Sequence, residues 1–288
     1  MKRIILITLV YAVAGSLTSY AWSQTNETNE FERITSERVG PYRPNTRADL
    51  QKTAQLIVDQ TNQFRVNQKR ETLKTDEQLT KTAEDFAQYM ARTGRYGHTA
   101  DDRTPSERAR AHDYEFCLIA ENIAYQFRTK GFATDPLAKR FIDGWKESPG
   151  HRENMLREHV TETGVAIAQS ESTGVYFAVQ LFGRPRSAAI AFQVSNQSGQ
   201  DIQYRIGKQE FSLPSRYTRS HQQCRPGQLE LLAKSETNEA AKPVTTIKLK
   251  TQTQIVVTLG SDGELKADVE ETEVREPEAK PDATDSSN

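Results

Sequence analysis

The sequence predicts an α+β domain followed by a small all-β module, and three observations lead to this fold class. Residues 45–156 place apolar side chains three or four positions apart, as amphipathic helices do. Residues 163–182 contain two apolar runs joined by a short turn, as in an antiparallel hairpin. From residue 188 onward, short apolar runs alternate with turn residues. Helices that precede paired strands indicate an α+β domain over residues 45–186.

The first two helices are predicted from their apolar faces and their capping residues. One face of the first helix carries Leu50, Ala54, Ile57, Thr61 and Phe64. The second helix is expected to start at Thr75 or Asp76 and to end at Gly94, because glycine tolerates the left-handed backbone of a helix end. Its apolar stripe consists of Leu79, Ala83, Phe86, Ala87 and Met90.

Three shorter helices follow. Thr104, with Pro105 and Glu107 after it, predicts a helix start in which the threonine and glutamate side chains cap the first backbone N–H groups. Another helix follows residues 134–136, and its apolar side consists of Leu137, Phe141 and Trp145. A short helix is expected over residues 148–156.

The expected strands are short. The hairpin of the first domain consists of residues 163–168 and 175–182. The β module, residues 187–261, is expected to hold strands at 190–194, 202–206, 229–232, 244–249 and 254–259. The same segment is also compatible with an extension of the first domain that has no independent core.

The N-terminus has the order of a secretory signal peptide. Lys2 and Arg3 precede an apolar run over residues 4–14, and small residues follow. This run is shorter than the roughly 20 residues that cross a membrane. We therefore expect residues 1–23 to be a cleaved signal peptide and the mature chain to be secreted or extracytoplasmic, without a membrane anchor. An uncleaved anchor is the alternative.

Charge and polarity set other segments apart. Residues 24–44 are polar and aperiodic and are predicted to be a linker. Residues 264–288 carry nine acidic and three basic side chains, so residues 262–288 are predicted to be a disordered acidic tail. The whole chain has a net charge of -1, without the basic excess of a nucleic-acid-binding domain. No nucleic-acid partner is expected, and the sequence does not indicate an oligomeric state.

Two of the five histidines lie where functional side chains are expected. His98 falls in a loop after the second helix. His151 falls in the first turn of the short helix, where the helix dipole disfavours the charged imidazolium and leaves the ring able to bind a metal. Glu121 and Glu147 are candidate carboxylates that lie nearby in the sequence. Spacing alone also permits a structural role, because histidines near helix starts often act as capping groups.

A set of motifs adds weight to these candidates, because together they resemble the CAP superfamily. This superfamily, also called SCP domains, includes cysteine-rich secretory proteins, antigen 5 and plant pathogenesis-related proteins. The motifs occur in order at residues 97–99 (GHT), 120–124 (AENIA), 145–156 (WKESPGHRENML), 163–166 (TGVA) and 176–182 (YFAVQLF). The bacterial branch is the most similar, through its S-P-G-H-R-x-N-x-L stretch. The resemblance covers about residues 50–186.

The resemblance implies an α-β-α sandwich with a central antiparallel sheet and a cleft lined by two histidines and two glutamates. Carried over by motif, these residues are His98, His151 and Glu121. The second glutamate is matched less well, because the family places it three residues after the tryptophan, where this sequence has Ser148. Glu147, one residue earlier, is the candidate. Trp145 and Phe182 are expected to be core residues.

Three functions are compatible with such a site. The first is a secreted CAP-domain protein whose cleft binds a divalent cation, with Zn²⁺ favoured and His98 and His151 as ligands, or a small ligand. The second is a metal-assisted hydrolase of extracellular polymers, with a catalytic set of His98, Glu121, Glu147 and His151 and a glutamate as base. The third is an interaction module with a vestigial cleft. The resemblance does not decide among the three, because one fold hosts several activities. Binding or interaction is placed ahead of catalysis.

The two cysteines predict a link between the two halves. Cys117 falls in an expected loop before Glu121, and Cys224 falls in the β module. In an exported chain, an even number of cysteines favours a disulfide over free thiols. Such a bridge would dock the β module beside the cleft. The alternative is a buried Cys117 and a surface thiol at Cys224.

Overall fold

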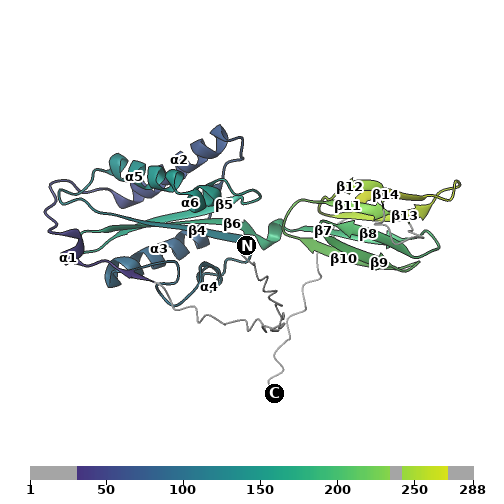
Figure 1. Ribbon diagram of the computed structural model, residues 1–288, viewed down its shortest axis with the longest axis horizontal. Coiled ribbons are helices and arrows are strands. Elements are labelled where there is room, and N and C mark those ends of the chain that lie inside the picture. Colours follow the sequence, from purple (N-terminus) through teal and green to yellow (C-terminus); the bar gives the residue numbers. More distant parts are fainter. Residues whose placement is uncertain (1–30, 234–241, 272–288) are drawn as a thin grey trace, which may run out of the picture.

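The computed structural model describes residues 31–233 and 242–271. It consists of a lobe of helices and strands and a second lobe of strands alone, arranged side by side along the long axis (Figure 1). The signal peptide predicted over residues 1–23 lies outside the described residues. Within the described residues, no helix has both the length and the apolar character needed to cross a membrane.

The first lobe is an α-β-α sandwich, as the resemblance implies. Its four-stranded sheet has the order β2-β5-β6-β4, and its long strands are antiparallel. These strands are β2 (Lys74–Thr75), β4 (Phe116–Gln126), β5 (Glu162–Gln169) and β6 (Tyr176–Pro185). One face is covered by α2 (Leu50–Asn67), α5 (Thr134–Glu147) and α6 (Pro149–Met155) (Figure 1). The opposite face is covered by α3 (Glu77–Thr93) and α4 (Pro105–Ala111).

Capping side chains start two helices, α3 and α4, where the sequence predicts. The Asp76 carboxylate accepts from the backbone N–H of Leu79, and Gly94 ends α3 with a left-handed φ of 70°. Thr104 and Glu107 form the predicted capping box at the start of α4. The first helix begins at Leu50 rather than near residue 45.

Two apolar layers hold the sandwich together, one on each face of the sheet. The layer under α3 includes Leu79, Phe86, Met90, Phe177 and Leu181. The layer under α2 and α5 includes Ile57, Phe141, Trp145, Tyr176 and Phe182. Successive side chains of β6 enter opposite layers, which explains why this strand reads as a continuous apolar run.

The segment predicted as a linker over residues 24–44 packs on the sandwich in its described part, residues 31–44. It contains β1 (Glu32–Arg33), which pairs with β3 (Arg95–Tyr96), and the short helix α1 (Ser36–Val39). Ile34 is 3% exposed, and its backbone N–H donates to the carbonyl of Gly94 at 2.8 Å. The linker prediction is therefore wrong for these residues, because single apolar side chains without periodicity are enough to dock a segment on a preformed surface.

The second lobe consists of two four-stranded sheets that face each other (Figure 1). Their orders are β10-β7-β13-β14 and β12-β11-β8-β9. The strands are β7 (Ile190–Asn196), β8 (Ile202–Ile206), β9 (Gln209–Leu213), β10 (Thr218–Gln223), β11 (Gln228–Leu232), β12 (Pro243–Lys248), β13 (Thr253–Leu259) and β14 (Leu265–Glu271). A core of its own lies between the sheets and includes Phe192, Val194, Tyr204, Leu231 and Ile255. A 3-10 turn, Arg186–Ala188, connects the lobes.

The strand β14 lies inside the segment predicted to be a disordered tail, residues 262–288. It pairs with β13 along its whole length, from Thr253 opposite Glu271 to Leu259 opposite Leu265. The prediction of disorder is therefore wrong for residues 265–271, and residues 272–288 lie outside the described part. An edge strand carries many charged residues because these oppose edge-to-edge association, so its composition resembles that of a tail. The strands β9 and β10 were not predicted either, because they are also polar strands at the edges of their sheets.

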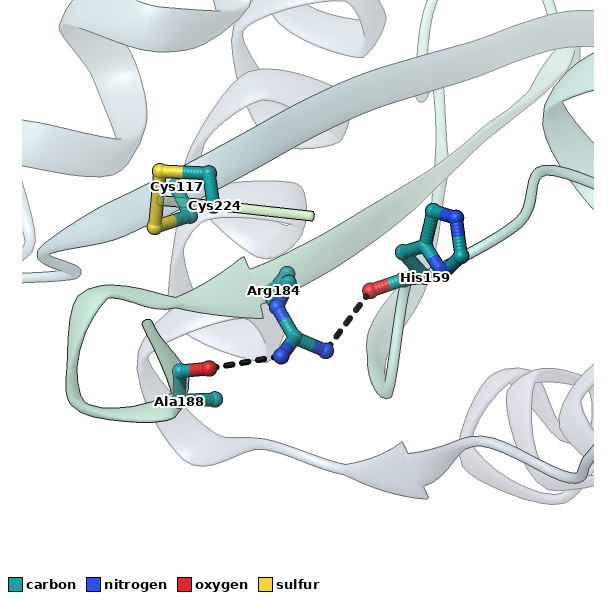
Figure 2. Close-up of a disulfide and its surroundings, with 5 residues drawn as sticks. All are labelled: Cys117, His159, Arg184, Ala188 and Cys224. Carbon is teal, nitrogen blue, oxygen red and sulfur yellow. Dashed lines mark hydrogen bonds between the residues drawn. A yellow bond between two sulfur atoms is a disulfide. The ribbon is translucent and has the colours of Figure 1, made fainter. Parts of the chain in front are cut away.

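The predicted disulfide between Cys117 and Cys224 is confirmed. The two sulfur atoms are bonded, and the Cα atoms lie 5.1 Å apart (Figure 2). Cys117 lies in the strand β4 rather than in a loop, and Cys224 follows β10. The bridge therefore ties the central sheet of the first lobe directly to the second lobe.

Removal of β14 is expected to destabilise the second lobe. Truncation after Glu264 leaves β13 unpaired on one side and uncovers the apolar side chains of Ile255, Val256 and Val257. The expected result is a melting temperature several degrees below that of a control truncated after Glu271, measured by circular dichroism. Equal melting temperatures of the two truncations would contradict the pairing.

Loss of the disulfide is expected to lower stability strongly. Cys117 and Cys224 are 107 residues apart in sequence, and closing a loop of about 100 residues stabilises by up to about 4.7 kcal/mol in the loop-entropy description. Urea unfolding of the Cys117→Ser/Cys224→Ser variant measures the loss. Alkylation of the unreduced wild type, followed by mass spectrometry, should find no free thiol, and two modified cysteines would refute the bridge.

Candidate functional site

The structure brings His98 and Glu121 together. His98 lies in the turn after β3, and Glu121 lies in the middle of β4. Nδ1 of His98 is 2.8 Å from Oε1 of Glu121. The side chain of Glu121 is 1% exposed, whereas that of His98 is 49% exposed. An ionised carboxylate only accepts hydrogen bonds, so this contact assigns the proton to Nδ1 and leaves Nε2 of a neutral ring as the free acceptor.

Arg108 binds the second oxygen of the same carboxylate. An Nη2–H group of Arg108 donates to Oε2 of Glu121 at 2.8 Å, and the arginine side chain is 3% exposed. Arg108 also donates to the carbonyl of His98 at 2.9 Å and to Oδ1 of Asp101 at 2.7 Å. Its guanidinium carbon lies 3.5 Å from the ring centroid of Phe86, a cation–π contact. One buried arginine therefore orders both the carboxylate and the turn that carries His98.

The second histidine reaches the site from α6. Burial lowers the pKa of His151 below its ordinary value, and any charge on the neighbouring His98 ring would lower it further. The ring of His151 is therefore kept neutral. Asn122 donates to the carbonyl of His151 at 3.0 Å, and Asn154 donates to the carbonyl of Glu121 at 3.1 Å. These amides lock α6 against β4.

Glu147 does not join this group. It is exposed in the last turn of α5 and makes no hydrogen bond or ion pair with the described residues. Trp145 on the same helix is 1% exposed and faces the core. A residue two positions further lies about 200° around the helix axis, so burial of the tryptophan turns Glu147 away from the sheet.

Two core aromatic residues behave as expected. Trp145 and Phe182 are 1% and 0% exposed. Nε1–H of Trp145 donates to the carbonyl of Ile123 at 3.2 Å, and the hydroxyl of Tyr96 donates to the same carbonyl at 3.3 Å. Burial raises the pKa of Tyr96 well above its ordinary value, so the hydroxyl stays a neutral donor. These contacts hold β4 in place beside the site.

The candidate metal ligands at the site are reduced to two imidazole rings. Within the described residues, no group of three or more His, Cys, Asp or Glu side chains is arranged to hold a metal ion. Both oxygens of Glu121 are engaged by Arg108 and His98. The nitrogen ligands that remain are Nε2 of His98 and the imidazole of His151. Glu121 contacts Nδ1 of His98, the kind of contact that carboxylates make with metal-binding histidines in other proteins.

The cleft itself was expected from the resemblance. Five surface cavities of the described residues have volumes of about 700, 400, 320, 620 and 460 Å³. None of these five is lined by His98, Glu121 or His151. The hydrogen bonds among its residues define the site, which lies outside these five cavities.

Sequence reasoning missed Arg108 as a member of the site. The helix that carries it was predicted, but no sequence signal separates Arg108 from Arg103 and Arg110 on either side. A basic residue in the last turn of a short helix usually faces solvent and the helix dipole. Its burial depends on Glu121, which is 13 residues away in sequence.

The α-β-α sandwich that carries these histidines can be assigned to a protein family by comparison with known families. Residues 58–182 match the family described as "CAP: Cysteine-rich secretory protein family". The first lobe is therefore a CAP domain and belongs to that family, as its motifs predict. No curated protein sequence matches the chain significantly.

Similar solved structures come from bacteria. An outer surface protein from Borrelia burgdorferi is 22% identical over 48% of this chain and 96% of its own, with a TM-score of 0.41. An extracellular SCP-domain protein from Bacillus anthracis is 29% identical over 47% of this chain and 41% of its own, with a TM-score of 0.40. A cysteine-rich secretory protein from Staphylococcus aureus is 15% identical over 47% and 40%, with a TM-score of 0.38.

Breaking the buried ion pair is expected to destabilise the CAP domain. Arg108→Met leaves the Glu121 carboxylate buried without its partner, a change that typically costs about 3–5 kcal/mol. The double variant Arg108→Met/Glu121→Leu removes both charges and should recover much of that loss. Lys139→Met, which breaks the exposed Lys139–Asp143 pair, is the control and should leave stability nearly unchanged. Urea unfolding measures all three, and a stable Arg108→Met variant would contradict the role of the pair.

Proposed function

We propose that this chain is an extracytoplasmic CAP-domain protein whose His98 and His151 bind a divalent cation or a small ligand. The observation that carries this proposal is the hydrogen bond between the buried Glu121 carboxylate and Nδ1 of His98. That bond selects the ring tautomer and leaves Nε2 available to a ligand. The neutral state of His151 supplies a second imidazole nitrogen.

Zn²⁺ is the favoured metal for these donors. Imidazole nitrogen suits Zn²⁺, whereas Ca²⁺ and Mg²⁺ prefer oxygen ligands. Two protein ligands leave the other coordination positions to water or to a bound molecule. Binding is therefore expected to be weaker and more exchangeable than at a closed structural site with four protein ligands. A bound cation would supply positive charge to polarise an anionic or carbonyl group of a ligand.

Binding is proposed ahead of hydrolysis because neither candidate carboxylate is placed as a base. Arg108 and His98 already occupy the two oxygens of Glu121. Glu147 is exposed and, among the described residues, forms no hydrogen bond or ion pair with the histidines. Glu121 is therefore proposed as a positioning residue for His98, not as a group that takes a proton from water.

An extracytoplasmic location is part of the proposal. The Cys117–Cys224 disulfide is of a kind that forms and persists in oxidising compartments. The N-terminal charged, apolar and small-residue order is that of an export signal. The family that residues 58–182 match is described as one of secretory proteins, which agrees with both features.

Calorimetric titration with Zn²⁺ tests the site. The His98→Ala/His151→Ala variant is expected to bind at least tenfold more weakly than wild type. A control variant, His112→Ala/His159→Ala, removes two histidines elsewhere and should keep the affinity. Glu121→Gln should weaken binding less than the double variant, because a glutamine side chain retains an oxygen that accepts from Nδ1.

The pH dependence has a definite sign. A protonated imidazole cannot bind a metal, so affinity should fall as pH falls through the histidine range. The lowered pKa of His151 keeps that ring available below the usual range. Equal affinity in wild type and in His98→Ala/His151→Ala would refute the site. Absence of binding by the wild type would favour an interaction module instead.

A further inference from the structure

We propose that a second site, a cavity at the junction of the two lobes, binds a small polyanion through arginine side chains. The cavity has a volume of about 620 Å³, within the range of small-molecule pockets. Eight of its lining residues come from the CAP domain and one, Arg225, comes from the β lobe. The lining includes four arginines and two glutamates, so positive charge is in excess. This inference does not depend on the function proposed for the histidine pair.

Two of the arginines have carboxylate partners and two do not. Arg70 pairs with Glu158 at 2.5 Å, and Arg157 lies 3.7 Å from Glu153. Within the described residues, Arg152 and Arg225 form no ion pair. The cavity therefore presents two uncompensated guanidinium groups, which favour anionic oxygen atoms as ligands.

The arginines of the CAP domain are held in place before a ligand arrives. The guanidinium of Arg152 lies 4.8 Å from the ring centroid of Phe64 and donates to Oε1 of Gln68 at 3.4 Å. Arg157 donates to Oδ1 of Asn154 at 3.0 Å, and its buried Nε has no hydrogen-bond partner. Side chains that are already ordered lose less conformational entropy on binding.

One wall of the cavity is tied to the turn between the lobes. His159 has a left-handed φ of 66°, an uncommon conformation for a residue other than glycine. Arg184 donates to the carbonyl of His159 at 3.3 Å and to the carbonyl of Ala188 at 2.6 Å (Figure 2). Arg184 thus connects the loop of His159, which lines the cavity, to the turn at Arg186–Ala188.

The disulfide supplies the arginine of the second lobe. Arg225 directly follows Cys224, and Cys224 is bonded to Cys117 of β4 (Figure 2). This bond holds Arg225 against a wall that is otherwise built from CAP-domain residues. Both lobes therefore contribute residues to the site, and the position of Arg225 in it depends on the disulfide.

The two unpaired guanidinium groups define the ligand class. Each planar fork matches a phosphate, sulfate or carboxylate group. Two of them in a cavity of this size suit a small molecule with at least two such groups. Tripolyphosphate is a suitable probe, and inorganic phosphate is the matched probe with a single group.

Calorimetry on the intact protein at low salt tests the site. Tripolyphosphate should bind at least tenfold more tightly than inorganic phosphate, and high salt should weaken it. Arg152→Gln/Arg225→Gln should lose at least tenfold in affinity. The control Arg128→Gln/Arg140→Gln removes the same charge from two exposed arginines beside another cavity and should keep the affinity. An equal loss in both double variants, or no loss in either, would overturn the proposal.

The role of the disulfide is tested by a cycle of variants. Cys117→Ser/Cys224→Ser should weaken tripolyphosphate binding by about the same factor as Arg225→Gln alone. Arg225→Gln added to the serine variant should then have no further effect, because the arginine is no longer held at the cavity. If the losses of affinity in the serine variant and in Arg225→Gln instead multiply in the combined variant, Arg225 reaches the site without the bridge. Circular dichroism confirms that each variant is folded.

Discussion

The buried ion pair between Arg108 and Glu121 is the interaction on which the candidate site depends. Two opposite charges almost without solvent exposure are tolerated only when their hydrogen-bonding groups find partners. Here the Nη groups of Arg108 also donate to Asp101 and to the carbonyls of Arg103 and His98, and the other oxygen of Glu121 contacts the ring of His98, whereas the buried Nε of Arg108 has no partner. The need to satisfy a buried guanidinium and a buried carboxylate therefore determines where the first histidine lies.

Two neighbouring residues of β4, Glu121 and Asn122, contact the two histidines. Successive side chains of a strand point to opposite faces of the sheet, so Glu121 and Asn122 bind different layers of the sandwich. Glu121 contacts α4 and the turn of His98, and Asn122 contacts α6 at His151. Asn154 closes the arrangement by donating to the backbone of Glu121. The strand β4 therefore contacts both histidine-bearing segments through two adjacent residues.

The same strand also connects the CAP domain to the β lobe, because it carries Cys117. Four residues of extended chain, about 13 Å, separate this cysteine from Glu121. The hydrogen bonds of the histidine site come from CAP-domain residues, whereas the arginine-lined cavity includes Arg225 of the β lobe. The β lobe is therefore placed to affect anion binding at the junction more directly than binding at the histidines.

Local patterns in the sequence determined the helices, the hairpin and the CAP motifs, whereas the pairing of the two cysteines was inferred from their even number and from the export signal. Helix caps and apolar spacing depend on residues within one or two turns, so they can be read without the tertiary fold. Only the tertiary structure decided that β14 forms an edge strand, that Glu147 faces solvent and that Arg108 is buried beside Glu121. Each of these depends on a partner distant along the chain, and a charged side chain carries no local mark that distinguishes a buried pair from a solvated one.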